Sequence, residues 1–142
     1  MQLNSMFLKN LTRISAKEKI FFVQHLDVML KAGLSLAESL NTLSLQTENK
    51  RFREIIIDIK EGVEKGKPFS TRLEKYNRVF DSLFINMIKA GEASGQLEAV
   101  LNRIYIQMKK DNELRSKVKG AMIYPAVILG AMTLIGTLML IF

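Results

Sequence analysis

An uncharged stretch closes the sequence, AMIYPAVILGAMTLIGTLMLIF, which runs from Ala121 to Phe142. It has 22 residues, and its few polar side chains are those of Tyr124, Thr133 and Thr137. A helix needs about 20 mainly apolar residues to cross the hydrocarbon core of a bilayer. We therefore expect a transmembrane helix here; the alternative is a helix buried in a protein core.

A basic cluster precedes this apolar stretch. The chain has 21 Lys and Arg against 14 Asp and Glu, a net charge of +7. Five of the cations lie within eleven residues, diluted by two acids: Lys109, Lys110, Arg115, Lys117 and Lys119, with Asp111 and Glu113. Lys and Arg beside a span stay on the cytoplasmic side and are drawn to anionic lipid. We therefore expect the preceding part of the chain in the cytoplasm, with Lys117 and Lys119 at the membrane surface.

We expect the chain to have three parts: a mobile N-terminal segment over residues 1–14, a cytoplasmic helical domain over 15–119 and the transmembrane helix over 120–142. About 120 residues before the span are enough for a helical core. The chain has no cysteine, which excludes disulfides and thiolate catalysis. The N-terminus has no apolar run of the length of a secretory signal, so insertion relies on the last stretch.

Helical spacing of apolar residues dominates the middle of the chain, and no segment alternates like a half-buried strand. Two stretches, Ser15–Glu18 and Ser35–Glu38, have the capping-box spacing that starts a helix. Between these first two helices, Ala32, Gly33 and Leu34 form a turn too short for anything except a sharp reversal.

The remaining helices are expected over about 49–65, around 69–76, from Asp81 or Ser82 onward, and from about 96 onward. The helix capped by Asp81 or Ser82 should bury Leu83, Phe84, Met87 and Ile88, and Gly91 and Gly95 should bracket the turn after it. The expected fold class is all-α, an antiparallel bundle of about six helices whose last helix continues into the transmembrane helix.

An internal echo accompanies this pattern. Met29-Leu30-Lys31-Ala32-Gly33 recurs as Met87-Ile88-Lys89-Ala90-Gly91, each time near the expected end of a helix. Two similar helix hairpins that face each other would explain the echo, and coincidence between two glycine stops is the alternative.

Chemistry is sparse in this sequence. His25 is the single histidine, and it has no nearby carboxylate or nucleophile with which to form a catalytic pair. With one His and no Cys, a zinc site of usual composition cannot be assembled. The glycines fit neither the phosphate loop nor the dinucleotide fingerprint. A cation site between helices is one interpretation of the carboxylates, and a solvated charged face is the favoured one: Asp58, Glu61, Glu64, Asp81 and Glu92. Along helix 49–65 the basic residues alternate with acidic ones, and the purely basic cluster lies at the membrane, which disfavours nucleic-acid binding. We expect no catalytic, metal or cofactor-binding residue, no enzymatic activity and no nucleic-acid binding.

Three motifs occur in a fixed order. The first motif is an aromatic-rich helix with an Ala-Gly stop, Phe21–Leu26 followed by Met29–Leu36. The second is a glycine-containing turn with a later Phe, Gly62–Phe69 and Val79-Phe80. The third is Ile88-Lys89-Ala90-Gly91-Glu92-Ala93-Ser94-Gly95-Gln96-Leu97, followed later by Ala121-Met122-Ile123-Tyr124-Pro125-Ala126. The ordered set, over about residues 17–128, resembles the F domain of type II secretion systems and type IV pilus assembly machines.

The resemblance implies a non-catalytic platform protein of the cell inner (cytoplasmic) membrane. It implies as partners an assembly ATPase, other inner-membrane assembly proteins and pilin-like subunits, and we expect a homo-oligomer. Family members usually carry two copies of the domain and several spans, whereas this sequence has one of each. Part of a longer protein and a short member of the family are both compatible with that difference. A tail-anchored helical adaptor that binds a soluble partner at the membrane is the alternative function.

The motif residues have expected physical roles. Gly91 and Gly95 allow the reversal between two helices, and Ser94 can cap the second of them. Ala93 belongs to the same turn. The carboxylate of Glu92 either accepts backbone N–H bonds or meets a basic partner.

The apolar stretch carries two further expectations. Tyr124 should lie at headgroup level, and Pro125 should restrict Tyr124 and kink the helix there. The small residues of the transmembrane helix share one helical face: Ala126, Gly130, Thr133 and Thr137. Such a face lets another transmembrane helix approach closely, and lipid exposure is the alternative.

Overall fold

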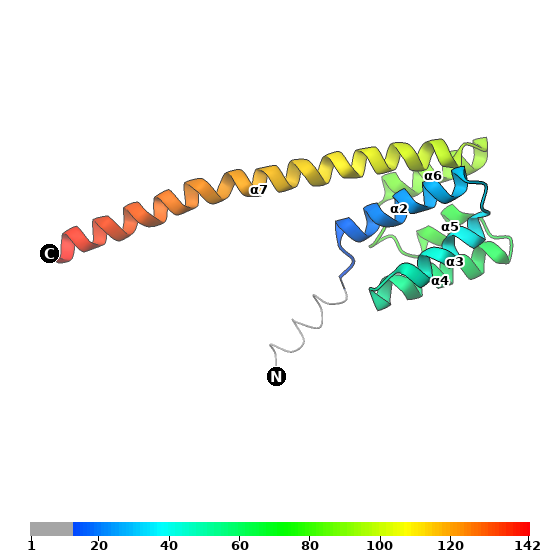
Figure 1. Cartoon of the computed structure of the whole chain (residues 1–142), viewed down its shortest axis with the longest axis horizontal. Helices are drawn as coiled ribbons and strands as arrows, with labels where there is room; N and C mark the ends of the chain where they lie inside the picture. Colours follow the sequence, from blue (N-terminus) through cyan, green and yellow to red (C-terminus); the bar gives the residue numbers. More distant parts are fainter. Residues whose placement is uncertain (1–12) are drawn as a thin grey trace. The chain divides into compact units, whose positions relative to one another are not determined.

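The computed structural model describes residues 13–142, and most of them are helical (Figure 1). In chain order, the helices are α2 (Ala16–Lys31), α3 (Leu36–Gln46), α4 (Lys50–Glu64), α5 (Phe69–Glu74), α6 (Ser82–Ser94) and α7 (Leu97–Ile141). Between residues 13 and 142 there is no strand. The all-α class, the helix count and the continuation of the last helix into the apolar stretch are confirmed. The expected mobile segment 1–14 lies outside the described residues except for Arg13 and Ile14.

The chain divides into two compact units, with the boundary after Met108. The first unit holds α2–α6 and the first three turns of α7, and the second is the rest of α7, from Lys109 to Phe142. Pro125 lies inside α7, which runs unbroken through it. In length and composition, α7 is able to cross a membrane.

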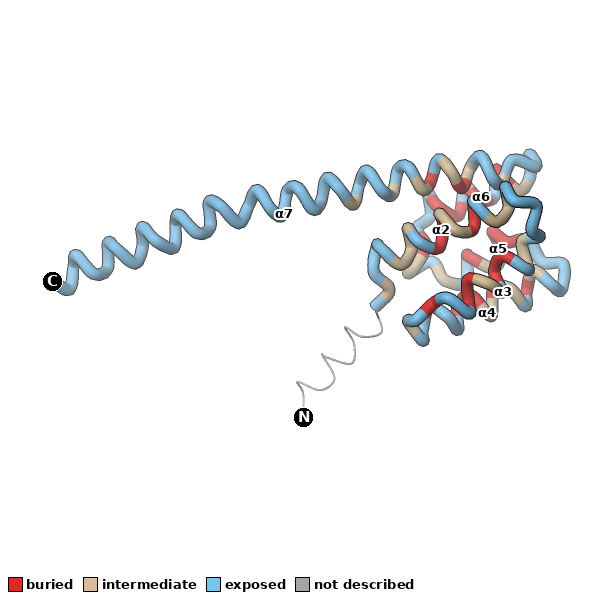
Figure 2. Tube along the Cα trace, viewed as in Figure 1, coloured by how far each residue is buried: buried red, intermediate tan, exposed pale blue. Residues whose placement is uncertain are grey.

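A single apolar core lies between the helices of the first unit (Figure 2). Four phenylalanines form a contiguous cluster within it: Phe22 of α2, Phe52 of α4, Phe80 before α6 and Phe84 of α6. Neighbouring ring centroids in this cluster are 5.0–6.4 Å apart, within the range that aromatic pairs prefer. The cluster joins three segments that are far apart in the sequence.

The expected inner face of α6 is wrong at one position. Leu83 is 57% exposed, whereas Ile85 is only 6% exposed. The buried stripe of α6 contains Phe84, Ile88 and Gly91, and Leu83 and Ile85 lie about 100° to either side of Phe84 on a helix. Only the side of Ile85 faces the core, so Ile85 takes the buried place expected for Leu83.

Side-chain caps fix where the helices begin. In both capping boxes the serine hydroxyl accepts the backbone N–H of the glutamate, and the glutamate side chain accepts the serine N–H: Ser15 with Glu18, and Ser35 with Glu38. The Ser35 N–H bond lowers the pKa of the Glu38 carboxyl. Asn49 caps α4 and Asp81 caps α6 through their side-chain oxygens. The sequence predicts both capping boxes and gives Asp81 as one of two candidates for the cap of α6, but it does not single out the Asn49 cap.

The reversal between α2 and α3 depends on Gly33. Its φ is +91°, in the left-handed region that favours glycine. The Gly33 N–H donates to the Leu30 carbonyl at 3.0 Å, and the Leu34 N–H donates to the Met29 carbonyl at 3.1 Å. This pair of bonds is the Schellman motif, which satisfies the last carbonyls of a helix.

Replacing Gly33 with Ala should destabilise the first unit by about 1 kcal/mol, because a Cβ is strained at this positive φ. Gly33→Asn is the matched control, since Asn tolerates the left-handed conformation and should recover most of the loss. Native-state hydrogen exchange of the α2 and α3 amides in the full chain measures the difference. Equal protection in the Ala and Asn variants would contradict this explanation.

Candidate functional site

The segment Gly91–Gly95 is the last turn of α6 and not an open loop. Gly91, Glu92, Ala93 and Ser94 are all helical, and only Gly95 has a left-handed conformation, with φ +68°. The expectation that the two glycines bracket a turn is therefore wrong for Gly91. The two glycines of the repeated motif therefore have different positions: Gly33 follows the end of α2, whereas Gly91 lies within α6.

Gly91 has a packing role. A Cβ built on Gly91 would lie 2.9 Å from Val100 Cγ2 and 3.3 Å from the Leu97 Cα. Both residues belong to the first turn of α7, so the absence of a side chain lets α6 and α7 approach closely. Any larger residue would push the start of α7 away from α6, because real Cβ atoms do not reach such short distances.

Glu92 caps a different helix. Its carboxylate accepts the backbone N–H of Phe69 at 2.5 Å and that of Ser70 at 3.0 Å. These are the first two N–H groups of α5, whose N-cap residue, Pro68, makes no side-chain cap bond. The first N–H groups of a helix have no acceptor within it, and a carboxylate there is also favoured by the helix dipole. Of the two expected roles, Glu92 has the one with backbone N–H groups.

Ser94 does not cap α7. Its hydroxyl donates to the Ala90 carbonyl at 2.9 Å, one turn back in α6. Ser94 is still helical, and a helical serine reaches the carbonyl four residues earlier. Its neighbour Ala93 is exposed. The motif as a whole therefore ties α6 to α5 through Glu92 and to α7 through Gly91.

Glu92→Ala should weaken the start of α5, because two part-buried N–H groups lose a charged acceptor. We expect a loss of about 1–3 kcal/mol in unfolding free energy and faster hydrogen exchange at the Phe69 and Ser70 amides. Glu54→Ala is the matched control, since Glu54 is an exposed acid in α4. Unchanged exchange at these two amides in Glu92→Ala would show that Glu92 does not cap α5.

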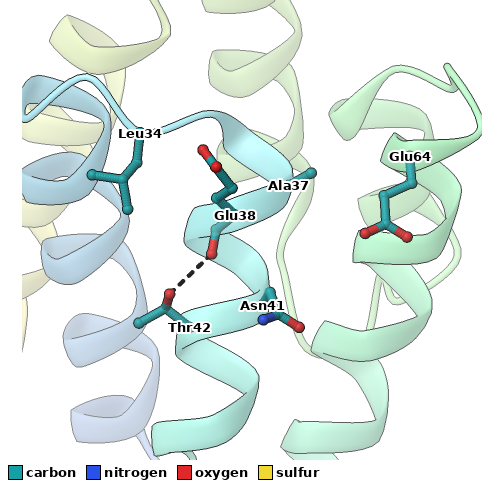
Figure 3. A pocket seen from close by; sticks show the side chains of 6 residues that line it. All are labelled: Leu34, Ala37, Glu38, Asn41, Thr42 and Glu64. Atoms are coloured by element: carbon teal, nitrogen blue, oxygen red, sulfur yellow. Dashed lines mark hydrogen bonds between the residues drawn. The ribbon is translucent and has the colours of Figure 1, made fainter.

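An open pocket of about 560 Å³ lies beside the first helix reversal (Figure 3). It is lined by the reversal, by α3 and by the end of α4: Leu34, Ala37, Glu38, Asn41, Thr42 and Glu64. The Thr42 hydroxyl is bonded back to the Glu38 carbonyl, and the Lys60 ammonium donates to the Asn41 side chain at 3.2 Å. Two carboxylates at an open pocket suit a basic side chain of a partner.

Asp58 gathers the polar side chains that join α4 to α5. One of its oxygens accepts from the Arg72 guanidinium at 2.8 Å, the Lys75 ammonium at 3.1 Å and the Tyr76 hydroxyl at 2.6 Å. The Tyr76 hydrogen bond is the main cause that lowers the pKa of the Asp58 carboxyl, with Lys75 and Arg72 adding to it. Burial, together with Asp58, raises the pKa of Tyr76 to about 12. Gly62 makes room for this cluster, because a Cβ there would lie 2.2 Å from Arg72 Nε.

Stability should therefore fall at high pH through Tyr76. The folded protein keeps the Tyr76 proton where the unfolded chain has lost it, so this stabilisation is fully present below about pH 10 and is lost as the pH rises toward about 12. Tyr76→Phe should abolish that part of the pH dependence. Urea unfolding at several pH values, with absorbance titration of tyrosinate, measures both. Identical profiles for the two proteins would contradict the Asp58–Tyr76 bond.

A buried acid joins α2 to α7, and sequence reasoning missed it. Asp27 is 4% exposed. One of its oxygens accepts from the Lys31 ammonium at 2.7 Å and from the Asn102 amide at 3.1 Å. A signal was present, because Asp27 follows Val23 by one turn on the buried face of α2 and precedes Lys31 by one turn. His25 lies on the same helix, stacked on Phe21 with its Nδ1 2.9 Å from the Phe21 carbonyl oxygen.

The residues expected at the membrane all lie on the second unit. Lys117, Lys119 and Tyr124 have exposed side chains on α7. The hydroxyls of the small-residue face are bonded to their own helix, Thr133 to the Leu129 carbonyl and Thr137 to the Thr133 carbonyl. This face therefore offers no free hydroxyl donor, and its packing against another helix stays a prediction.

The fold is thus that of a small helical bundle whose last helix carries a membrane-length apolar stretch. A sequence model of the family described as type II secretion system (T2SS), protein F, matches residues 22–142. The chain belongs to this family. The matched range includes both the bundle and the apolar part of α7.

Similar proteins carry names from two kinds of machine. A type IV pilus assembly protein PilC of Thermus thermophilus is 41% identical over 79% of this chain and 27% of its own length. One from Myxococcus xanthus is 38% identical over 82% of this chain and 28% of its own length. A type II secretion system protein F of Xanthomonas campestris is 37% identical over 76% of this chain and 27% of its own length. The chain therefore spans less than a third of the length of these relatives.

Proposed function

We propose that this chain is a platform component of a type IV pilus or type II secretion assembly machine at the cell inner membrane. Residues 15–119 form its cytoplasmic F-type domain and residues 120–142 its transmembrane helix. The match of one family over both the bundle and the apolar helix carries this proposal. That match favours a machine component over a tail-anchored adaptor with no link to filament assembly.

The proposed mechanism is conformational coupling without bond chemistry. α7 contributes Leu101 and Ile104 to the core of the bundle, and the same helix carries the apolar stretch. Three features hold its first turns: these buried side chains, the close approach at Gly91, and the bond between Asn102 and Asp27. A force on the bundle would therefore act on α7 through packed contacts and not through a flexible linker.

The partners of this mechanism are an assembly ATPase on the cytoplasmic side, other inner-membrane assembly proteins and pilin-like subunits. A second copy of the chain would pack along the face of Ala126, Gly130, Thr133 and Thr137. The pocket beside the first helix reversal supports a protein contact on the cytoplasmic side, because its Glu38 and Glu64 carboxylates complement a basic side chain. Glu92 is a poor probe of docking, since its carboxylate holds the start of α5.

The test is a pull-down of the full chain in detergent against the assembly ATPase encoded beside it. Wild type should bind, and Glu64→Lys should bind at least about tenfold more weakly if the pocket receives a basic side chain, because the charge at the contact is reversed. Glu54→Lys makes the same change on the same helix, away from the pocket-lining residues, and should leave binding unchanged.

Each result separates a different part of the proposal. A folded, membrane-inserted chain that does not bind the ATPase would contradict the coupling function. Binding that survives Glu64→Lys would exclude the pocket as the docking surface and leave the coupling function standing.

A further inference from the structure

The basic cluster before the apolar stretch has two unlike halves. Residues 109–113 carry two cations and two acids and are electrically balanced. Residues 115–119 carry three cations and no acid: Arg115, Lys117 and Lys119. All three side chains are exposed on α7, and within residues 13–142 they form no ion pair. The unbalanced charge is therefore confined to the turns next to the apolar residues.

The three cations lie on two sides of the helix. At about 100° per residue, Arg115 and Lys119 are one turn apart on one side, and Lys117 is about 160° from each of them. The small-residue face of Ala126 and Gly130 continues the side of Arg115 and Lys119, since all four positions fall within a sector of about 60°. A shallow apolar surface and a pair of cations therefore follow one another along one side of α7.

The depth of these cations suits a lipid headgroup. With about 1.5 Å of rise per residue, Lys119 lies about 3 Å and Arg115 about 9 Å before Ala121 along the helix axis. The headgroup layer on each side of a bilayer is about 5–8 Å thick. If Ala121 begins the span, both cations are within reach of phosphate groups in that layer, because their side chains are long and flexible.

We propose that Arg115 and Lys119, which precede the helix-packing face of Ala126 and Gly130, form a binding site for the phosphate of an anionic phospholipid. A guanidinium binds phosphate oxygens through two parallel bonds, and an ammonium adds a point charge. A lipid with net negative charge is preferred over a zwitterionic one, because the site has two cations and no acid of its own. This inference rests on the membrane placement in the proposed function.

The experiment uses the full chain in detergent and native mass spectrometry to count retained lipids. The probes are phosphatidylglycerol and phosphatidylcholine with the same acyl chains, and inorganic phosphate alone tests whether the acyl chain is needed. Wild type should retain phosphatidylglycerol over both other probes. Arg115→Gln and Lys119→Gln should each weaken retention about fivefold. Lys117→Gln is the matched control, since it removes the same charge at a depth between those of Arg115 and Lys119 but on the opposite side, and it should change retention less than twofold.

The outcomes are distinguishable. Equal loss in Lys117→Gln and Lys119→Gln would reduce the effect to general surface charge and overturn the site. A change of oligomeric state in Lys119→Gln, with lipid retention unchanged, would assign Arg115 and Lys119 to a contact with a second copy and overturn the lipid site. Flotation with neutral phosphatidylcholine vesicles tests the span itself: a chain that does not insert contradicts the membrane placement in the proposed function, whereas insertion without a preference for phosphatidylglycerol overturns the lipid site alone.

Discussion

The carboxylate of Glu92 is the interaction on which the arrangement of the last three helices depends. It supplies acceptors to the first two N–H groups of α5 from the far end of α6. α5 has only six residues, too few to be stable alone. Its formation therefore requires the packing of Phe69 and Leu73 into the core together with this cap. Because Gly91, one residue earlier, lets α7 approach, one helical turn positions both neighbours of α6.

Two other groups of polar contacts join pairs of helices in the first unit. The Asp58 cluster joins α4 to α5 at a half-buried surface, and the Asp27–Asn102 bond joins α2 to the start of α7. The phenylalanine cluster, which brings together α2, α4 and α6, is apolar and directional only through ring packing. Burial supplies most of the stability of such a bundle, whereas the charged bonds fix which helices are neighbours.

Local signals made much of the fold predictable from the sequence. The capping boxes at Ser15 and Ser35 act over three residues and the Gly33 stop over three to five, so pattern and structure agree there. The role of Glu92 could be narrowed to two options but not decided, because its partners lie more than 20 residues earlier in the chain. The sequence pattern favours Leu83 over Ile85 on the inner face of α6, which is wrong for a similar reason: both positions flank the apolar stripe, and only tertiary packing selects one. The family motif is recognisable as a pattern in the sequence. That Gly91 packs against α7 whereas Gly95 adopts the left-handed conformation depends on where α7 starts, which the pattern does not give.

The order of synthesis gives the cap of α5 a further consequence. The first N–H of α5 obtains its acceptor only when Glu92 has been synthesised, 23 positions later. The core is complete only when Leu101 and Ile104 of α7 have been added. Only 16 residues separate Ile104 from the apolar stretch, which is about 1–3 s of translation at typical rates. The bundle therefore completes its core at nearly the moment when the hydrophobic segment becomes available for insertion. A chain that is inserted early would have to close its core while already attached to the membrane.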